Sequence, residues 1–367
     1  MNKNKRVVVG MSGGVDSSVT ALLLKQQGYD VVGLFMRNWE YGIKGSQCPN
    51  RIEFEDAKKV GALIGIEVIG KDFVKEYRDR VFDVFLEGLK QGLTPNPDIL
   101  CNKEIKFNVF LNEAKKMGAD MIATGHYAKI AKYKDHFVLD TPKDSSKDQT
   151  YFLHALSSEQ LSHAMFPLGD LTKKEVREIA RAHNLPVSDK KDSTGICFIG
   201  NQKFDEFITQ HLQAIPGDIL DENGKVIGKH KGLVCYTLGQ RKGIGLGGLK
   251  GNESENNTHK PWFVAAKDVI NNTLTIVQDT NHPLPMSKTV AAKQMHWVLE
   301  VAPKVGDKLM AQVRYRQQKQ ACTVVEASEE KVIVEFDNPQ RAVTLGQSLV
   351  LYFGDYCLGG GFISFYK

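Results

Sequence analysis

The sequence has no long apolar run. Its 367 residues are 42% hydrophobic and 25% charged, yet no stretch approaches the ~18 apolar residues that a membrane-spanning helix needs. The first residues, MNKNKRVVVG, pass from a short basic stretch directly into a strand-like run, without the apolar segment and cleavage site of a secretory signal peptide. We therefore expect a cytoplasmic protein of two or three domains, with a substantial core and no membrane partner.

Cysteine is scarce, and none of the six cysteines forms a Cys-X-X-Cys pair with another. The lack of such a pair argues against a zinc ribbon, and structural disulfides are not expected in a reducing compartment. Any cysteine chemistry would then be catalytic. Cys235 and Cys322 lie inside strand-like runs and are interpreted as packing residues, whereas Cys48 lies in a loop and is left open, with a structural role favoured.

A strong excess of one charge is also missing. The net charge of +5 permits a nucleic-acid partner, but dispersed Lys and Arg are more typical of an ordinary solvated surface. Residues 286–367 hold 10 Lys and Arg against 8 Asp and Glu. If this section binds RNA, it does so through a local patch or through its shape.

Strand-like and helical stretches alternate over the first 200 residues. Apolar runs predict strands, and 3.6-residue spacing predicts helices between them, with Gly28 as a C-cap and Thr172 as an N-cap; the predicted strands are 5–10, 29–39, 66–73 and 119–130, and the helices are 15–28, 53–65, 108–118 and 172–184. This alternation predicts an α/β fold with a doubly wound parallel sheet.

The pattern changes after about residue 200 to short strands separated by Gly, Asn and Asp. The glycine-rich stretch 242–260 is interpreted as a mobile loop, and the alternation over 308–353 is typical of a barrel or sandwich. We expect three domains, namely a catalytic domain over 1–203, a small β-rich central domain over 204–284, and a C-terminal β-barrel over 285–367.

The stretch GMSGGVDSS, residues 10–18, follows the first predicted strand and opens the first helix. Backbone amides freed by Gly13 and Gly14, together with the helix N-terminus, form a cradle for an anion. The loop lacks Gly-Lys-Ser/Thr, so it is not a Walker-type P-loop. Asp16 is a candidate to help hold Mg²⁺ against pyrophosphate oxygens, without forming a fixed metal site. The alternative is a tight strand–helix turn that is rich in glycine and serine.

The complete string resembles the PP-loop of the ATP pyrophosphatase superfamily, whose enzymes cleave ATP between the α and β phosphates. The resemblance implies an adenine nucleotide alpha hydrolase-like sheet, with ATP as co-substrate. It places the phosphates on Gly10, Met11, Ser12, Gly13, Gly14, Val15, Asp16 and Ser17. It places the adenosine beside Met36 and Gly125, which stand at the ends of predicted strands.

Two further stretches each present a cysteine. TPNPDILCNKEIKF, residues 94–107, sets Asp98 three residues before Cys101, on the same side if a helix begins there. DSTGICFIG, residues 192–200, contains Cys197, and Lys190 and Lys191 stand nearby to favour its thiolate. Taken alone, either cysteine is as readily a buried packing residue as a nucleophile.

Nine strings in order resemble the tRNA-specific 2-thiouridylase family almost from end to end: GMSGGVDSSV, GLFMRNWE, TPNPDILCNKEIKF, ATGHY, KDQTYFL, KKDSTGICFIG, LGQRKGIG, RYRQ and CLGGG. The resemblance implies that ATP adenylates the C2 oxygen of the wobble uridine of tRNA. It makes Cys197 the persulfide carrier, Cys101 the nucleophile and Asp98 a general acid/base. The sulfur would come from a cysteine desulfurase, directly or through relay proteins, and the acceptors would be tRNAs for Lys, Glu and Gln.

Some relatives of this kind carry Cys at the position of Asp98, which invites an iron–sulfur cluster. This chain offers only Asp98, Cys101 and Cys197 there, so we favour a route without a cluster, in which a Cys101–Cys197 disulfide forms and is reduced each turn.

The resemblance also assigns tRNA contacts. The target base would meet Asn96, Pro97 and Asp98 after flipping out of its stack, and other parts of the tRNA would meet His126, Lys147, Asp148, Gln149, Arg314, Tyr315 and Gln347. On pattern alone these segments have plainer interpretations. Residues 147–153 read as a turn followed by a strand, His126 as a satisfied core histidine, and 313–317 as a solvated strand with Arg314 and Arg316 on one face. Arg241 and Lys242 lie on a glycine loop suited to backbone phosphates.

Two other functions compete. A PP-loop ligase acting on a small molecule, of the amidating or argininosuccinate type, explains the phosphate loop but neither the two loop cysteines nor the β-rich C-terminal third. An RNA-binding protein with a vestigial nucleotide site is disfavoured by the intact SGGVDSS string.

Overall fold

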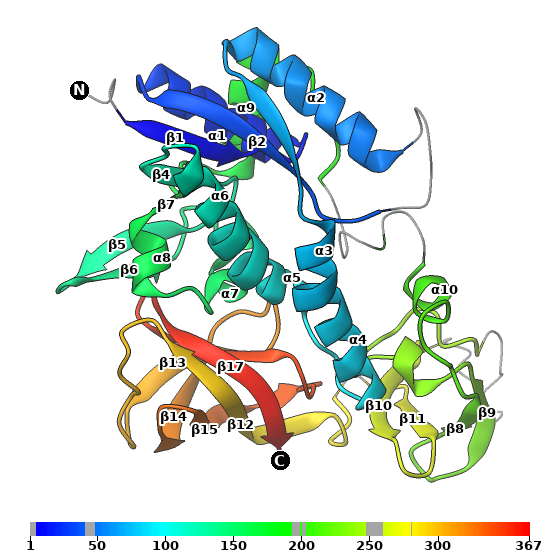
Figure 1. Ribbon diagram of the computed structural model, residues 1–367. Helices are drawn as coiled ribbons and strands as arrows, with labels where there is room; N and C mark the ends of the chain where they lie inside the picture. The colour runs from blue at the N-terminus through cyan, green and yellow to red at the C-terminus, as the bar shows by residue number, and fades with distance from the viewer. Residues whose placement is uncertain (1–4, 41–47, 193–198, 200–202, 247–259, 280) are drawn as a thin grey trace.

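The computed structural model describes residues 5–40, 48–192, 199, 203–246, 260–279 and 281–367. It has three parts (Figure 1): an α/β part with the N-terminus, a C-terminal barrel beneath it, and a smaller β-rich part beside both. Among the described residues, no helix is long and apolar enough to cross a membrane.

A parallel sheet of five strands forms the centre of the N-terminal part. Its spatial order is β3-β2-β1-β4-β7, and every neighbouring pair is parallel. The strands are β1 (Arg6–Gly10), β2 (Asp30–Arg37), β3 (Val68–Asp72), β4 (Met121–Ala123) and β7 (Ala164–Met165). The chain runs outward from β1 to β3 and then returns to the other side of β1, which confirms the predicted doubly wound sheet.

Helices cover both faces of this sheet, as the apolar run Val7–Val9 requires. Val7 and Val9 belong to one apolar cluster, with α1, α2 and α9, and Val8 belongs to the other, with η3 and α6. The bounds are α1 (Val15–Gln26), α2 (Pro49–Ile64), α9 (Lys173–Ala182), η3 (Cys101–Val109, a π-helix) and α6 (Phe110–Lys116). Successive side chains of β1 thus fill two cores on opposite faces.

The predicted helix ends are confirmed by their geometry. Gly28 follows α1 with φ +83°, which a glycine adopts without steric cost. Thr172 caps α9 in a reciprocal box, because its hydroxyl accepts from the amide of Glu175 and the Glu175 carboxylate accepts from the amide of Thr172.

A second helical run links the sheet to the lower parts of the molecule. Its elements are α3 (Val74–Tyr77), η2 (Arg78–Phe82, a π-helix), α4 (Asp83–Lys90) and α5 (Pro97–Leu100). The short helices η4 (Ser145–Lys147), α7 (Thr150–Leu153) and α8 (Ser158–Ser162) follow later in the chain. The strand predicted after Gln149 is wrong, because residues 150–153 form α7. Asp148 accepts from both the amide and the hydroxyl of Thr150 and so starts that turn.

The single strand predicted over 119–130 is also wrong, since β4 ends at Ala123 and a separate hairpin follows. That hairpin, β5 (Lys129–Tyr133) and β6 (His136–Asp140), leaves the parallel sheet and pairs with the last strand of the chain. Gly125 lies in this break, where its backbone passes so close to α1 that a Cβ would lie 2.8 Å from the amide nitrogen of Ser17.

The central part is a four-stranded sheet of order β10-β11-β8-β9. Its elements are α10 (Phe204–Ile208), β8 (Gly217–Leu220), β9 (Val226–His230), η5 (Leu233–Cys235), β10 (Phe263–Asp268) and β11 (Thr273–Val277). Cys235 is buried as predicted, but in the 3₁₀ turn η5 and not in a strand. Most of the glycine-rich stretch 242–260 lies outside the described residues.

The C-terminal part is a closed antiparallel barrel, as predicted. Its strands follow the order β12-β15-β14-β13-β16-β17, and β12 pairs with β17 to close it. The bounds are β12 (Met286–Trp297), β13 (Lys308–Gln312), β14 (Gln320–Ala327), β15 (Lys331–Arg341), β16 (Ser348–Phe353) and β17 (Tyr356–Tyr366). Cys322 in β14 and Cys357 in β17 are buried, and burial raises the pKa of each thiol to about 12, which makes both inert packing residues.

We expect Thr172→Ala to lower the free energy of unfolding by about 1 kcal/mol, because α9 loses its N-cap. Urea denaturation followed by circular dichroism measures the shift. Lys174→Ala is the control, since the Lys174 side chain is 85% exposed and its loss should have almost no effect. An equal shift in both variants would contradict the capping role.

Candidate functional site

A large cleft of about 1740 Å³ opens at the carboxyl ends of β1 and β4. This is the point at which the strand order of the sheet reverses, where open α/β sheets bind their ligands. The described lining comes from all three parts of the chain, from Gly10–Met11 through Asn96–Asp98 and Tyr236–Thr237 to Gln347. One continuous space therefore joins the phosphate loop to the central domain and the barrel.

The phosphate loop connects β1 to α1, and its surroundings leave no space for a side chain at Gly13 or at the neighbouring Gly125. A Cβ on Gly13, whose φ is +70°, would lie 2.3 Å from the carbonyl oxygen of Glu53, and one on Gly125 would lie 2.8 Å from the amide of Ser17. Gly14 is the N-cap of α1 and has no side chain that could accept a hydrogen bond from the first amides of the helix. Those amides remain available to an anion in the cleft. The predicted nucleotide residues Met36 and Gly125 also line the cleft.

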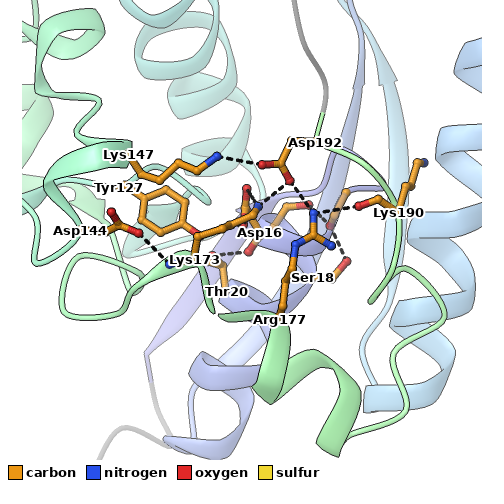
Figure 2. Close-up of polar contacts among 12 residues, drawn as sticks. Asp16, Ser18, Thr20, Tyr127, Asp144, Lys147, Lys173, Arg177, Lys190 and Asp192 are labelled. Atoms are coloured by element: carbon orange, nitrogen blue, oxygen red, sulfur yellow. Dashed lines mark hydrogen bonds and ion pairs between the residues drawn. The ribbon is translucent and has the colours of Figure 1, made fainter. Parts of the chain in front are cut away.

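Asp16 is paired with a lysine that the sequence did not reveal. The Lys173 ammonium lies 2.7 and 2.8 Å from the two carboxylate oxygens of Asp16, and the Tyr127 hydroxyl donates to Asp16 at 3.0 Å (Figure 2). Burial and the charge of Asp16 both raise the pKa of Tyr127, so this phenol stays protonated. The carboxylate that we predicted for Mg²⁺ is thus already neutralised by a protein cation.

Asp192 is held by three cations. Lys147, Lys173 and Arg177 lie 3.0, 2.7 and 2.9 Å from its carboxylate, and Figure 2 shows them converging on it. Partial burial works to raise the pKa of Asp192, but the hydrogen bonds from Lys173 and Lys147 outweigh it and lower the pKa to about 2. Asp192 directly precedes residues 193–198, and the predicted carrier Cys197 lies outside the described residues.

Lys190 was predicted to favour a thiolate at Cys197. Its ammonium donates to the carbonyl oxygen of Gly13 at 3.0 Å and to Asp56 at 2.9 Å. It therefore joins the phosphate loop to α2, whereas its effect on Cys197 stays a prediction.

The other predicted cysteine, Cys101, lines the cleft. A helix does begin at Pro97, and Asn96 caps it by accepting from the amide of Asp98 at 3.1 Å. Asp98 and Cys101 consequently both line the cleft, with Cys101 only 4% exposed. Burial raises the pKa of Asp98, and the positive charge of Lys106 offsets part of that rise. A carboxyl group with a raised pKa in a cleft is suited to proton transfer.

His126 is a satisfied histidine that also lines the cleft. Lys106 can only donate, so its contact with Nε2 at 3.4 Å makes that nitrogen the acceptor, and Nδ1–H donates to Thr124 Oγ1 at 2.7 Å. Burial, reinforced by the charge of Lys106, holds the pKa of His126 well below its ordinary value. The ring is neutral and fixed in one tautomer.

The predicted tRNA-contacting side chains are mostly engaged within the protein. Lys147 and Gln149 line the cleft, but Gln149 Oε1 accepts from the amide of Tyr127 at 2.9 Å. Tyr315 packs on Phe152, with ring centroids 4.2 Å apart. The amide of Gln347 donates to the carbonyl oxygen of Thr94 at 2.6 Å.

The strand predicted at 313–317 is wrong, because β13 ends at Gln312 and a turn follows. Arg316 has φ +64°, which breaks the alternation of a strand. Arg314 donates to the carbonyl oxygens of Leu238 and Ala342 at 2.9 and 3.1 Å and so ties the central part to the barrel. Arg241 and Lys242 are exposed, and Lys242 lines the cleft.

Sequence profiles divide the chain in the same three parts. Residues 5–201 match the family described as tRNA methyl transferase HUP domain, 205–278 its PRC-barrel domain, and 287–363 the aminomethyltransferase beta-barrel domain. A protein of Aliarcobacter butzleri named tRNA-specific 2-thiouridylase MnmA 2 is 95% identical over 367 residues, which is 100% of both chains. The chain belongs to the tRNA-specific 2-thiouridylase family.

More distant members of this 2-thiouridylase family also match over nearly the whole chain. The protein named tRNA-specific 2-thiouridylase MnmA in Burkholderia ambifaria is 53% identical, over 98% of this chain and 93% of that one. The protein of that name in Herminiimonas arsenicoxydans is 51% identical over 98% of each. The resemblance drawn from the nine strings is thereby confirmed.

The lowered pKa of Asp192 predicts a pH-dependent contribution to stability. Its ionised form stabilises the fold above pH 3.8, and this contribution disappears as pH falls toward about 2. Asp192→Asn should thus be less stable than the wild type at neutral pH, by on the order of 1–2 kcal/mol, and the difference should shrink between about pH 4 and about pH 2. Urea unfolding across this pH range is the measurement.

Asp189→Asn is the matched control, because the Asp189 side chain is 79% exposed and, among the described residues, forms an ion pair with Arg181 alone. A pH-independent difference between Asp192→Asn and the wild type would refute the role of the ionised carboxylate.

Proposed function

We propose that this protein catalyses the ATP-dependent 2-thiolation of the wobble uridine of tRNA. The observation that carries the proposal is the single cleft that joins the phosphate loop to Asp98 and Cys101 in a member of the 2-thiouridylase family. A small-molecule ligase would need neither the cysteine nor a space bounded by three domains. The excess of cations over carboxylates in the described lining also suits a polyanionic substrate. The carboxylates are Asp16, Glu53, Asp98, Asp192 and Asp205, and the cations are Lys106, Lys147, Lys190, Lys191, Lys203, Lys231, Lys242 and Arg316.

In the first step, ATP binds with its phosphates on the amides of residues 10–17 and its adenosine beside Met36 and Gly125. The flipped-out uridine lies against Asn96–Asp98. Its C2 oxygen attacks the α-phosphorus, and pyrophosphate leaves. The helix dipole of α1 and the ammonium groups near the loop stabilise the leaving anion.

In the second step, the terminal sulfur of a Cys197 persulfide attacks C2 of the adenylated base. Cys101 then attacks the Cys197 sulfur, the S–S bond to the transferred sulfur breaks, and AMP leaves as the C2=S bond forms. The products are 2-thiouridine and a Cys101–Cys197 disulfide. A thiol reductant must supply two electrons to reopen it before the next turn.

Asp98 is proposed as the general acid/base beside the base. Its raised pKa, which follows from burial, lets it exchange protons nearer to neutral pH than an exposed aspartate. This gives the chain a proton acceptor at the position where Cys would otherwise complete a Cys-X-X-Cys pair. Among the described residues, no group of three His, Cys, Asp or Glu side chains is arranged to hold a metal.

Mg²⁺ is proposed to arrive with the triphosphate as part of the substrate. Asp16 would meet it beside Lys173, whose ammonium contacts both of its oxygens. We further propose a cytosolic location, tRNAs for Lys, Glu and Gln as acceptors, and a cysteine desulfurase or sulfur-relay protein as donor.

Cys101→Ser and Cys197→Ser should each abolish 2-thiouridine formation, because neither serine carries or displaces sulfur. The measurement is mass spectrometry of nucleosides from tRNA incubated with Mg·ATP, a persulfide donor and a thiol. Cys48→Ser is the control, since Cys48 is the N-cap of α2 and serine is a good N-cap. Thiolated uridine from Cys197→Ser, or none from the wild type, would refute the proposed function.

Lys106→Met should move the acidic limb of the pH–rate profile to higher pH. The charge of Lys106 lowers the pKa of Asp98, so its removal lets burial raise that pKa further. Single-turnover thiolation from about pH 5 to pH 9 measures the limb, and Asp98→Asn should remove it. An unmoved limb in Lys106→Met would show that another group titrates.

A further inference from the structure

The barrel holds the backbone on which the uridine site is built. The amide of Thr94 donates to the carbonyl oxygen of Leu345 at 2.8 Å, and the side-chain amide of Gln347 donates to the carbonyl oxygen of Thr94 at 2.6 Å. Both polar backbone groups of Thr94 therefore end on barrel residues. Thr94 is four positions before Asp98.

The barrel segment around Gly346 approaches Leu93 and Thr94 so closely that only a glycine fits at position 346. Gly346 has φ +85°, and a Cβ built on it would lie 2.9 Å from Leu93 Cβ and 3.0 Å from the amide nitrogen of Thr94. Any larger residue at this position must push Leu93 and Thr94 away from the barrel.

The opposite side of the same turn is held by α4. A Cβ built on Gly88 would lie 2.7 Å from Cγ of Pro95, so the proline ring rests directly on the helix backbone. Pro95 and Pro97 each fix their own φ near −65°, and Asn96 accepts from the amide of Asp98. The backbone between Thr94 and Asp98 is therefore stiff, and a displacement of Thr94 also displaces Asp98.

The barrel segment is itself fixed to the catalytic domain. Ser348, which follows Gln347, accepts from the Tyr151 hydroxyl through its carbonyl oxygen at 3.0 Å, and its own hydroxyl lies 3.0 Å from His154 Nε2. All three residues are buried. These two buried contacts hold Ser348, and with it the neighbouring Gln347, against the catalytic domain.

We propose that the C-terminal barrel positions Asp98 through Thr94, and that Gln347 is a positioning residue for the thiolation reaction instead of a tRNA contact. The inference rests on the proposed function. It gives the barrel a part in the chemical step, beyond any part in holding RNA.

The test is steady-state thiolation with tRNA as the varied substrate. Gln347→Leu removes the donor but keeps much of the side-chain volume, so kcat should fall by about 10-fold or more while KM for tRNA stays within about 2-fold. Gly346→Ala should do the same by pushing Thr94 away. Rates are expressed per nucleotide-binding site, titrated with a non-hydrolysable ATP analogue, so that misfolded protein does not count.

A second arm uses the Asp98→Asn background. If Gln347 acts through Asp98, Gln347→Leu should lower the residual rate there by less than about 2-fold, since residues that act as a unit are not additive. Gln320→Leu is the matched control, because the Gln320 amide also donates to a carbonyl oxygen, that of Gln318, within the barrel. It should leave kcat and KM unchanged.

A rise in KM for tRNA with unchanged kcat would overturn the inference and assign Gln347 to the RNA. No change in either constant, or full additivity with Asp98→Asn, would overturn it as well. These results differ from failure of the proposed function, in which the wild type itself forms no 2-thiouridine.

Discussion

The rest of the site depends on one close approach of backbone to backbone at the carboxyl ends of β1 and β4. Gly125 packs against the Asp16–Ser17 peptide, and Gly13 packs against the carbonyl oxygen of Glu53. These contacts leave no space for side chains between the start of α1 and its two neighbours, which are the segment after β4 and the helix α2. The amides of the phosphate loop are therefore fixed by the fold before any ligand arrives, which is the preorganisation that electrostatic stabilisation of phosphate requires.

A chain of ion pairs connects the phosphate loop to residues farther along the cleft. Lys173 joins Asp16 to Asp192, and Lys147 joins Asp192 to the segment before α7. Three cations, including Arg177, thus face two carboxylates, and one of them, Lys147, also lines the cleft. If Lys147 contacts an RNA phosphate, as the proposed function implies, it would link that contact to Asp16 through Asp192 and Lys173.

Features that depend on a few neighbouring residues could be predicted from the sequence. The buried run Val7–Val9 and the glycines of the phosphate loop predicted a strand, a turn and a helix, because each signal lies within a few neighbouring residues. The pairing of Lys173 with Asp16 was missed, since 157 positions separate them and Lys173 carries no signal beyond its place after an N-cap. Arg314 was misplaced for a related reason: alternation over five residues cannot reveal that the positive φ of Arg316 turns the chain.

The hairpin β5–β6 belongs to the sheet of the barrel, although the chain makes it long before the barrel. Leu139 and Asp140 pair with Cys357 and Tyr356 in β17, the last strand. At ribosomal rates of about 5–20 residues per second, the edge of β6 waits roughly 10–40 s for its partner. During synthesis β6 is thus an unpaired sheet edge, and its length of only five residues keeps the edge that it offers to other chains short.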